Sequence, residues 1–455
     1  MSMLRISFLL FVTAVFECLC NSATNNSEVK LLLVSFDGFR ASYLERYSFP
    51  NLQKMISNGA MVKDVKNVFV TKTFPNHYSI VTGRYAESHG IIANYMYDPA
   101  TKNNFSVNTV EEFWWNEATP IWVTNERQGH KSGGAMWPGT DVSIHNTTPS
   151  YYLKYNQSVT FSERADHIIE WFSNSTNTIN FGTLYWEEPD STGHRFGPNS
   201  EELDKMLKEV DDHIGYLIDQ LKKTGLWNKV NVIITSDHGM AQCSEKKVIQ
   251  LDNCIGRGNY TRITYSPVAA ILPLTNASYV YKLLLNCDKH MKVYLKKNIP
   301  DYYHYKDNSR IQPILLVADE GWTIVQNGSL PRLGDHGYDN ALPSMHPLLV
   351  AYGPAFQKAY KTKTINSIDV YPLMCHILGL KEEPNNGTFR NVRCLLANES
   401  CIGQPEVIGI VIGSLMILMT LSCLMILVKK RASPQRTFAR LQLQEEEDDD
   451  DPLIN

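Results

Sequence analysis

The sequence has no excess of either charge and few cysteines. Its 455 residues include 43 basic and 47 acidic side chains, which leaves a formal net charge of −4. Without a strongly cationic surface, we do not expect the protein to bind nucleic acid. Nine cysteines are too few to build the fold from disulfides, so a hydrophobic core must hold it together. With 43% hydrophobic residues, the chain is also not a disordered or low-complexity protein.

The N-terminus has the pattern of a secretory signal. A basic start at Arg5 is followed by an apolar run from Ile6 to Phe16, and cleavage is expected between Cys20 and Ala23. We therefore assign residues 1–23 to a signal peptide, rather than to a buried N-terminal helix.

A second apolar segment, 407–428, contains no charged residue and is long enough to cross a bilayer. The basic cluster 429–431 follows at once, which predicts a cytoplasmic C-terminus. The chain is thus predicted to be a single-pass type I protein of the plasma membrane, with an ectodomain at 24–406 and a tail at 429–455. Ten glycosylation sequons all lie between the two apolar segments, at Asn25, Asn104, Asn146, Asn156, Asn174, Asn259, Asn276, Asn327, Asn386 and Asn398.

Six cysteines remain in the ectodomain, which allow 15 connectivities. We favour the pairs Cys394–Cys401 and Cys254–Cys287. Cys375 lies in an apolar run typical of a buried helix and is expected to be a free core thiol.

The ectodomain is predicted to be one α/β domain. Apolar runs at 31–36, 178–186 and 230–235 are typical of buried strands. Between the last two, apolar residues recur every three or four positions from Leu203 to Leu221, which predicts an amphipathic helix. This alternation favours a mostly parallel sheet with helices on both faces.

Acidic residues follow all three predicted strands, at the sheet edge where such folds bind ligands. A single Asp there is ordinarily a turn residue or a helix cap. Here, however, Asp190 precedes His194 by four residues in a turn containing Gly193, and two Asp-His-Gly tripeptides begin at Asp237 and Asp335. The glycine that ends each tripeptide permits the bend that turns both ligands to one side. Mixed Asp and His ligands suit zinc and, less tightly, manganese or iron. The inventory is sufficient for two ions with open positions, and comprises Asp37, Asp190, His194, Asp237, His238, Asp335 and His336.

Paired zinc ions commonly assist the in-line attack of a nucleophile on phosphorus. We expect this nucleophile near Thr73. Thr73 is followed by Pro75, which predicts the start of a helix whose N-terminus favours an anionic phosphoryl group. On spacing alone, the pattern favours a simple helix N-cap at Thr73.

Five ordered motifs carry a family resemblance. Ser35-Phe-Asp-Gly-Phe39, Thr71-Lys-Thr-Phe-Pro-Asn-His77, Glu188-Pro-Asp-Ser-Thr-Gly-His194, Ser236-Asp-His-Gly-Met240 and Gly334-Asp-His-Gly-Tyr338 resemble the catalytic motifs of the ectonucleotide pyrophosphatase/phosphodiesterase family. The resemblance covers nearly the whole ectodomain and implies an alkaline-phosphatase-like fold. The ectodomain leaves no room for the Cys-rich or nuclease-like modules of larger members.

The resemblance also implies roles for individual residues. Asp190, His194 and His336 would hold one zinc ion, and Asp37, Asp237, His238 and the Thr73 hydroxyl would hold the other. Thr73 would form a nucleotidyl-threonine intermediate that water hydrolyses. Asn94 would donate to a phosphate oxygen, and Phe74 and Tyr155 would sandwich the base. Tyr155 could instead be an ordinary surface aromatic, since Asn156 opens a sequon. Asp335 resembles a residue that supports the ligands.

Among the family's substrates, the resemblance favours dinucleoside polyphosphates such as diadenosine triphosphate, cleaved to AMP and ADP, and diadenosine tetraphosphate. The released ADP would feed purinergic signalling. The alternative is a choline-type phospholipid phosphodiesterase of the same family. A sulfatase is disfavoured because Thr73 and its neighbours lack the Cys/Ser-x-Pro-x-Arg signature. A non-enzymatic adhesion protein is disfavoured because every ligand position is filled.

The tail contains seven consecutive acids, from Glu445 to Asp451. Such a block is most often a solvated, disordered segment. The sequence before Leu453 and Ile454 also resembles an acidic dileucine sorting signal, which would bind a clathrin adaptor and cycle the protein through endosomes.

Overall fold

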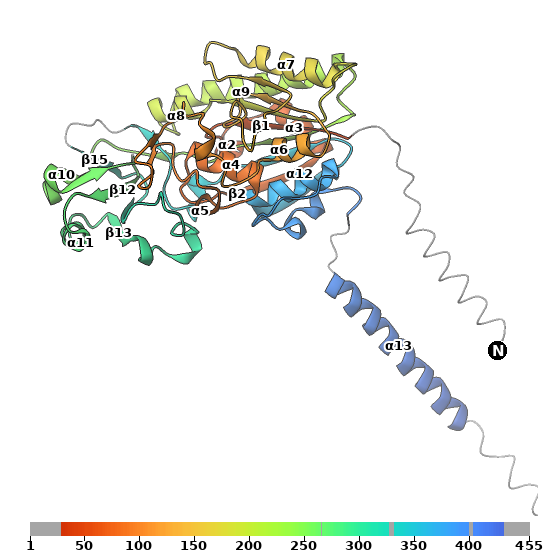
Figure 1. Cartoon of the computed structure of the whole chain (residues 1–455). Coiled ribbons are helices and arrows are strands. Elements are labelled where there is room, and N and C mark those ends of the chain that lie inside the picture. The colour runs from red at the N-terminus through yellow and green to blue at the C-terminus, as the bar shows by residue number, and fades with distance from the viewer. Residues whose placement is uncertain (1–28, 265, 327–331, 400–403, 432–455) are drawn as a thin grey trace, which may run out of the picture. The chain divides into compact units, whose positions relative to one another are not determined.

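A computed structural model describes residues 29–264, 266–326, 332–399 and 404–431 (Figure 1). The predicted signal peptide, Cys401 and the acidic tail lie outside these residues, so the pairing of Cys394 with Cys401 and the sorting signal stay predictions. The chain divides into two compact units, one ending at Glu399 and one beginning at Ser400.

The first unit is built around an eight-stranded sheet of mostly parallel strands. The three predicted strands, β1, β7 and β8, are neighbours and run parallel to one another at its centre. β17 runs antiparallel to both of its neighbours. The strand order is β18 (Tyr360–Asn366), β2 (Ala60–Lys66), β17 (Leu349–Tyr352), β8 (Val230–Thr235), β1 (Lys30–Phe36), β7 (Phe181–Trp186), β5 (Ser132–Ala135), β6 (Tyr151–Leu153).

Helices cover both faces of this sheet, as predicted (Figure 1). Successive residues of β1 point to opposite faces, so Leu31 and Leu33 pack into one hydrophobic cluster while Leu32 and Val34 pack into another. The first cluster includes α4 (Thr73–Thr82), α6 (Ile121–Arg127) and α12 (Val370–Leu378). The second includes α3 (Pro50–Asn58), α7 (Phe161–Ser173) and α9 (Glu201–Lys223). Cys375 is a buried free thiol in α12, as expected.

The amphipathic helix predicted over 203–221 is the core of α9. Its apolar residues are buried against the sheet, and the Ser200 side chain accepts a hydrogen bond from the Leu203 N–H at its N-terminus. Three acids in its first turn and two lysines in its last turn complement the helix dipole.

A smaller lobe, which the sequence did not predict, lies between β8 and β17 in the chain. Its four-stranded antiparallel sheet has the order β11 (Tyr260–Arg262), β12 (Val268–Pro273), β14 (Ile314–Ala318), β13 (Met291–Leu295). The predicted disulfide Cys254–Cys287 joins α10 (Leu251–Ile255) to the residues that follow α11 (Ala277–Leu285). Nearby strands extend the lobe towards the central sheet, as β10 (Val248–Gln250) with β15 (Thr323–Val325) and β9 (Ala241–Gln242) with β16 (Gly334–Asp335).

Two local expectations were wrong. Asp190 and His194 lie in a helix, α8 (Asp190–Phe196), and not in a flexible turn. Gly239 does not adopt a left-handed backbone; its glycine is needed because a Cβ there would lie 2.1 Å from the Ser344 carbonyl oxygen. Gly337, by contrast, does have a positive φ of 115°, which permits the predicted bend after His336.

The second unit contains α13 (Gln404–Arg431), which includes the predicted span 407–428. Its stretch Val411–Lys429 is long and apolar enough to cross a membrane. Among the described residues of the first unit, eight sequon asparagines are visible and none is buried.

Candidate active site

The predicted ligands converge at the carboxyl ends of the central strands. Asp37 follows β1, Asp237 follows β8, and Asp190 begins α8 shortly after β7. In α8, Asp190 and His194 are four residues apart and therefore lie on one face of the helix. His336 comes from the segment after β16.

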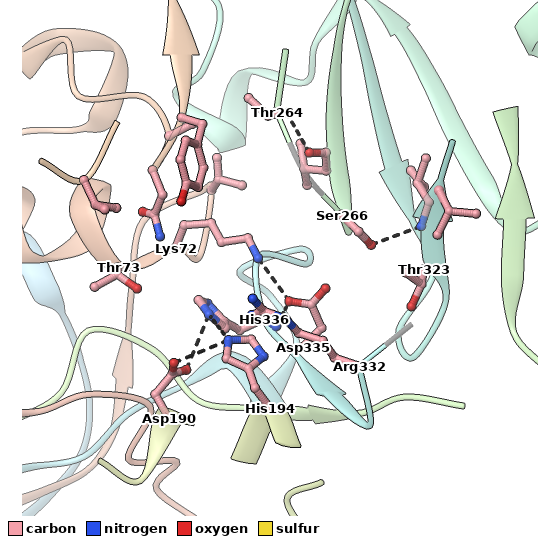
Figure 2. Close-up of a pocket in the computed structure, with 18 of the residues that line it drawn as sticks. Lys72, Thr73, Asp190, His194, Thr264, Ser266, Thr323, Arg332, Asp335 and His336 are labelled. Carbon is pink, nitrogen blue, oxygen red and sulfur yellow. Dashed lines mark hydrogen bonds and ion pairs between the residues drawn. The ribbon is translucent and has the colours of Figure 1, made fainter. Parts of the chain in front are cut away.

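The residues predicted to hold the first ion form one tight group. Asp190, His194 and His336 present ligand atoms within 4.8 Å of one another. His194 Nε2 lies 3.4 Å from one Asp190 oxygen, and His336 Nε2 lies 3.4 Å from the other. Figure 2 shows both imidazoles directed at this carboxylate.

The residues predicted to hold the second ion also meet. His238 Nε2 lies 3.0 Å from Asp237 Oδ2 and 3.3 Å from Asp37 Oδ1. The Thr73 hydroxyl is 3.3 Å from the same nitrogen. Asp190 faces both sets, because it also forms a candidate group with Asp37 and His238.

The tautomers of the three histidines follow from their backbone contacts. Nδ1 lies within hydrogen-bond distance of a carbonyl oxygen in each: Gly334 for His194, Gly239 for His238 and Thr71 for His336. A carbonyl only accepts, so each Nδ1 carries the proton and each Nε2 presents a lone pair. The Nε2 atoms of His194 and His336 are 3.1 Å apart, and two lone pairs cannot hydrogen-bond to each other. A cation between them resolves this conflict.

The carboxylates are ready for a cation in the same way. Asp37 Oδ2 accepts from the Tyr185 hydroxyl at 2.7 Å, and Asp237 Oδ1 accepts from the Gly38 N–H and the Ser236 hydroxyl. The second oxygen of each, and Asp190 Oδ1, are buried without a hydrogen-bond partner among the described residues. Buried, unsatisfied carboxylate oxygens are costly. Together with the histidine lone pairs, they form a donor set that fits metal ions.

The electrostatics agree with this interpretation. Burial, and then the charges of Asp237 and Asp190, raise the pKa of Asp37 well above its usual value. Burial lowers the pKa of His194 to about 4, so its imidazole is neutral near pH 7. Burial also lowers the pKa of His336, with the neighbouring His238 adding to the effect. At His238 burial also lowers the pKa, but the charges of Asp237 and Asp190 oppose burial and the pKa is raised. The neutral imidazoles of His194 and His336 and the mutually repelling carboxylates are what a bound dication would stabilise.

Thr73 begins α4, with Lys72 and not Thr73 in the capping position. Thr73 is thus the first helical residue, and its hydroxyl lies 3.3 Å from His238 Nε2. Next to it, the Phe74 N–H donates to Asn94 Oδ1 at 2.9 Å. Because that oxygen is engaged, the Nδ2 group of Asn94 is the part available to donate to a ligand.

Two cavities meet at Thr73. The large cavity, of about 820 Å³, extends from Lys72 and His336 to the smaller lobe, where Thr264 and Ser266 line it (Figure 2). Arg262 of the same lobe also lines it. The small cavity, of about 400 Å³, is lined by Phe74 and Tyr155 among other aromatic residues. Five residues belong to both cavities: Thr73, Asn94, Val107, Asp190 and Ser191.

The structure adds residues that the sequence did not single out. His77 is buried one helical turn after Thr73, with Nε2 2.9 Å from the Ser35 hydroxyl and Nδ1 2.9 Å from the Thr73 carbonyl oxygen. Lys72 donates to Asp335 at 3.1 Å, and Asp335 also accepts from the His336 N–H. Asp335 thus supports the loop of a candidate ligand and belongs to none of the ligand groups described above. The sequence did contain one signal for His77, because a residue four positions after Thr73 lies on the same face of a helix.

Comparisons with known proteins give consistent matches. The family model of type I phosphodiesterase/nucleotide pyrophosphatase matches residues 31–339. The bis(5'-adenosyl)-triphosphatase ENPP4 of Xenopus laevis is 59% identical over 449 residues, which cover 98% of this chain and 99% of that protein. The human protein of the same name is 61% identical over 428 residues, which cover 93% of this chain and 94% of that protein.

A solved structure of murine ectonucleotide pyrophosphatase/phosphodiesterase 5 is 52% identical and superimposes with a TM-score of 0.80. The match covers 81% of this chain and 100% of that one. That protein is an inactive threonine-to-alanine variant in complex with AMP. The likeness confirms the predicted fold class.

Proposed function

This chain belongs to the type I phosphodiesterase/nucleotide pyrophosphatase family, and on that premise we propose that it hydrolyses dinucleoside polyphosphates outside the cell. Diadenosine triphosphate would give AMP and ADP, and diadenosine tetraphosphate is a further substrate. The motif resemblance to the family is confirmed, and the relatives that are 59% and 61% identical are both named bis(5'-adenosyl)-triphosphatase ENPP4. The proposal rests chiefly on one observation: Thr73 lies where two Asp/His groups and two cavities meet.

Two zinc ions fit the donor set. Asp190, His194 and His336 would hold one ion. Asp37, Asp237, His238 and the Thr73 hydroxyl, whose atoms lie within 3.3 Å of His238 Nε2, would hold the other. When bound, the ions supply Lewis acidity that lowers the pKa of a hydroxyl and neutralises phosphoryl charge. Backbone carbonyls fix the histidine tautomers needed for this role.

The side chains of the chain itself perform the transfer. Thr73 Oγ1 would form a bond to the α-phosphorus while its proton passes to water in the cavities. The bond from phosphorus to the bridging oxygen breaks, and ADP leaves with the electron pair. The Asn94 Nδ2 group would donate to a phosphate oxygen during this step. Water then hydrolyses the nucleotidyl-threonine and releases AMP.

The small cavity would hold the nucleoside of the transferred half. Phe74 and Tyr155 both line it, and the ring of Tyr155 is 47% exposed, which leaves a face for stacking. The murine relative in complex with AMP supports a nucleotide in this family's site.

A choline-type lipid phosphodiesterase is the second candidate. Aromatic and acidic residues together suit a quaternary ammonium, and Asp141 and Glu187 line the small cavity. The large cavity, with Lys72, Arg262 and Arg332, favours a polyphosphate instead.

The test combines zinc analysis with substrate competition on the purified full chain. We expect two zinc ions per chain and release of AMP and ADP from diadenosine triphosphate. Faster turnover of lysophosphatidylcholine or glycerophosphocholine would replace this proposal with the lipid one. Absence of bound zinc and of any turnover would favour the adhesion protein.

We also propose that the enzyme is a type I plasma-membrane protein anchored by 407–428, with ADP release feeding purinergic signalling. The apolar stretch in α13 supports a single-pass anchor. Exposed sequon asparagines such as Asn146 and Asn276 suit a glycosylated ectodomain.

For the tail, surface biotinylation would compare uptake of the wild type with Leu453→Ala/Ile454→Ala. Equal uptake would leave the tail as a solvated charged segment.

A further inference from the structure

The large cavity differs from the small one in its charge. Two acids line it, Asp190 and Asp335. Asp190 belongs to the candidate ligands, and Asp335 accepts from Lys72. Against these stand four cations, Lys72, Arg195, Arg262 and Arg332. This wall therefore suits a ligand with several negative charges beyond the phosphate that Thr73 attacks.

Arg262 is held in this wall by its own strand. It ends β11, where it pairs with Ile271 of β12, and its Nη1 donates to the Ile324 carbonyl oxygen at 3.2 Å. From this anchored position Arg262 lines the large cavity. A backbone anchor reduces the entropy that the side chain loses when it binds a phosphate.

Tyr95 provides an aromatic surface in the same cavity. It directly follows Asn94, is 42% exposed and lines the cavity together with Val107. An exposed aromatic ring can stack on a nucleobase of any sequence, because every base has a π-face. The cavity therefore combines cations for phosphates with a ring for a base.

From this arrangement we propose that Arg262 and Tyr95 determine specificity for the leaving nucleotide. Arg262 binds the phosphates of the leaving ADP, and Tyr95 stacks on its adenine. The inference rests on the proposed function, since it requires Thr73 to attack the α-phosphorus. An in-line displacement needs the leaving oxygen opposite the nucleophile, and the large cavity is the second space that reaches Thr73. As the phosphorus–oxygen bond breaks, negative charge grows on the leaving ADP, where Arg262 would stabilise it.

The role of the Arg262 charge in binding the leaving phosphates is tested with two substrates that transfer the same AMP. Diadenosine triphosphate loses ADP, whereas the nitrophenyl ester of AMP loses a phenolate without phosphate. For Arg262→Gln, we expect the ratio of kcat/KM for diadenosine triphosphate over the ester to fall about tenfold or more, as for a lost charged hydrogen bond. Arg262→Lys should recover part of the loss. Arg257→Gln removes a cation from the same lobe, but from an exposed pair with Asp252, and should keep the wild-type ratio.

The stacking of Tyr95 on the leaving base is tested with a second pair of substrates. ADP-ribose also transfers AMP, but its leaving ribose 5-phosphate carries no base. In Tyr95→Ala, kcat/KM for diadenosine triphosphate should fall about tenfold relative to ADP-ribose, the loss expected for one stacked base. Tyr95→Phe keeps the ring and should retain the wild-type ratio. All variants are compared as full-length glycosylated protein, with the thermal midpoint as a check on folding.

The outcomes separate this inference from the proposed function. If Arg262→Gln and Tyr95→Ala reduce both substrates of a pair equally, or change neither, the leaving nucleotide does not bind here and the inference is wrong. In either case the wild type still releases AMP, so the proposed function stands. A wild type that cleaves no nucleotide substrate would overturn both.

Discussion

The two cavities beside Thr73 share five residues but differ in chemistry. Acids and aromatic rings line the small cavity, with Lys154 as its basic residue, whereas four cations line the large one. The residues of the small cavity belong to the part of the first unit that is built on the eight-stranded sheet. Part of the large cavity is lined by the smaller lobe. The candidate catalytic residues and the cationic wall therefore come only in part from the same region of the chain. Segments that follow the central strands contribute Asp37, Asp190 and Asp237, whereas the insertion between β8 and β17 contributes both His336 and Arg262.

The largest expected effect comes from the residues that both cavities depend on. Thr73→Ala should reduce turnover of every substrate by about a thousandfold or more, because the nucleophile is lost. It should keep bound zinc, since the hydroxyl is one ligand among four. His336→Ala should lose turnover and one zinc ion, and chelators should inactivate the wild type until zinc is restored. Metal analysis and stopped assays check this, and near-normal turnover by Thr73→Ala would mean that water attacks directly.

A substitution in the small cavity should affect all nucleotide substrates alike. Tyr155→Ala removes one stacking face, so we expect KM to rise about tenfold for diadenosine triphosphate, ADP-ribose and the nitrophenyl ester. Tyr155→Phe is the matched control, because it keeps the ring. Initial-rate kinetics give the three values. A rise confined to one substrate would show that the nucleoside half does not bind against this ring.

Salt should distinguish the cavities without mutation. Added salt screens exposed cations such as Arg332, so KM for diadenosine triphosphate should rise a few-fold between low and physiological ionic strength. KM for the nitrophenyl ester should change less, because its leaving group has no phosphate. Assays across a sodium chloride series measure both. Parallel curves would contradict the assignment of the polyphosphate to the cationic side.

The smallest effect on catalysis is expected from His89, which lines neither cavity. Burial lowers the pKa of His89 to about 3, from an ordinary value of 6.5. The folded state therefore binds fewer protons than the unfolded state between these values. The contribution of His89 to the stability should be constant above about pH 7 and fall by up to about 1.4 kcal/mol per pH unit below pH 6.5. Urea unfolding of the wild type and His89→Gln checks this, and the stability difference between them should narrow as the pH falls.

The central part of the fold could be predicted because its signals are local. Each of β1, β7 and β8 is a continuous apolar run, and α9 has an apolar residue every three or four positions. The turn predicted at Asp190–His194 was wrong for a tertiary reason. Gly193 packs against Met240, and a Cβ on Gly334 would lie 2.3 Å from the Gly193 carbonyl oxygen. These contacts with distant segments stabilise α8, and no local window contains them.

The candidate ligands could be predicted for a different reason from the cavity walls. Asp37, Asp190 and Asp237 each follow a strand, so the topology alone brings them together. Tyr95 and Arg262 share no motif and lie in segments joined only by the folded chain. Their common cavity depends on how the smaller lobe packs beside α4, which periodicity does not encode.

Because the chain is synthesised from its N-terminus, the residues that meet in the candidate site are made at different times. Lys72 and Asp335 are partners but lie 263 residues apart, and Thr73 and His336 are their immediate neighbours. At synthesis rates of about 5–20 residues per second, roughly 15–50 s separate the appearance of the nucleophile from that of the last ligand. On the proposed function, a nascent chain would expose its threonine long before the last candidate ligand is synthesised. Metal loading would then be a late event of biogenesis, and an ectodomain interrupted before His336 would have no hydrolytic activity.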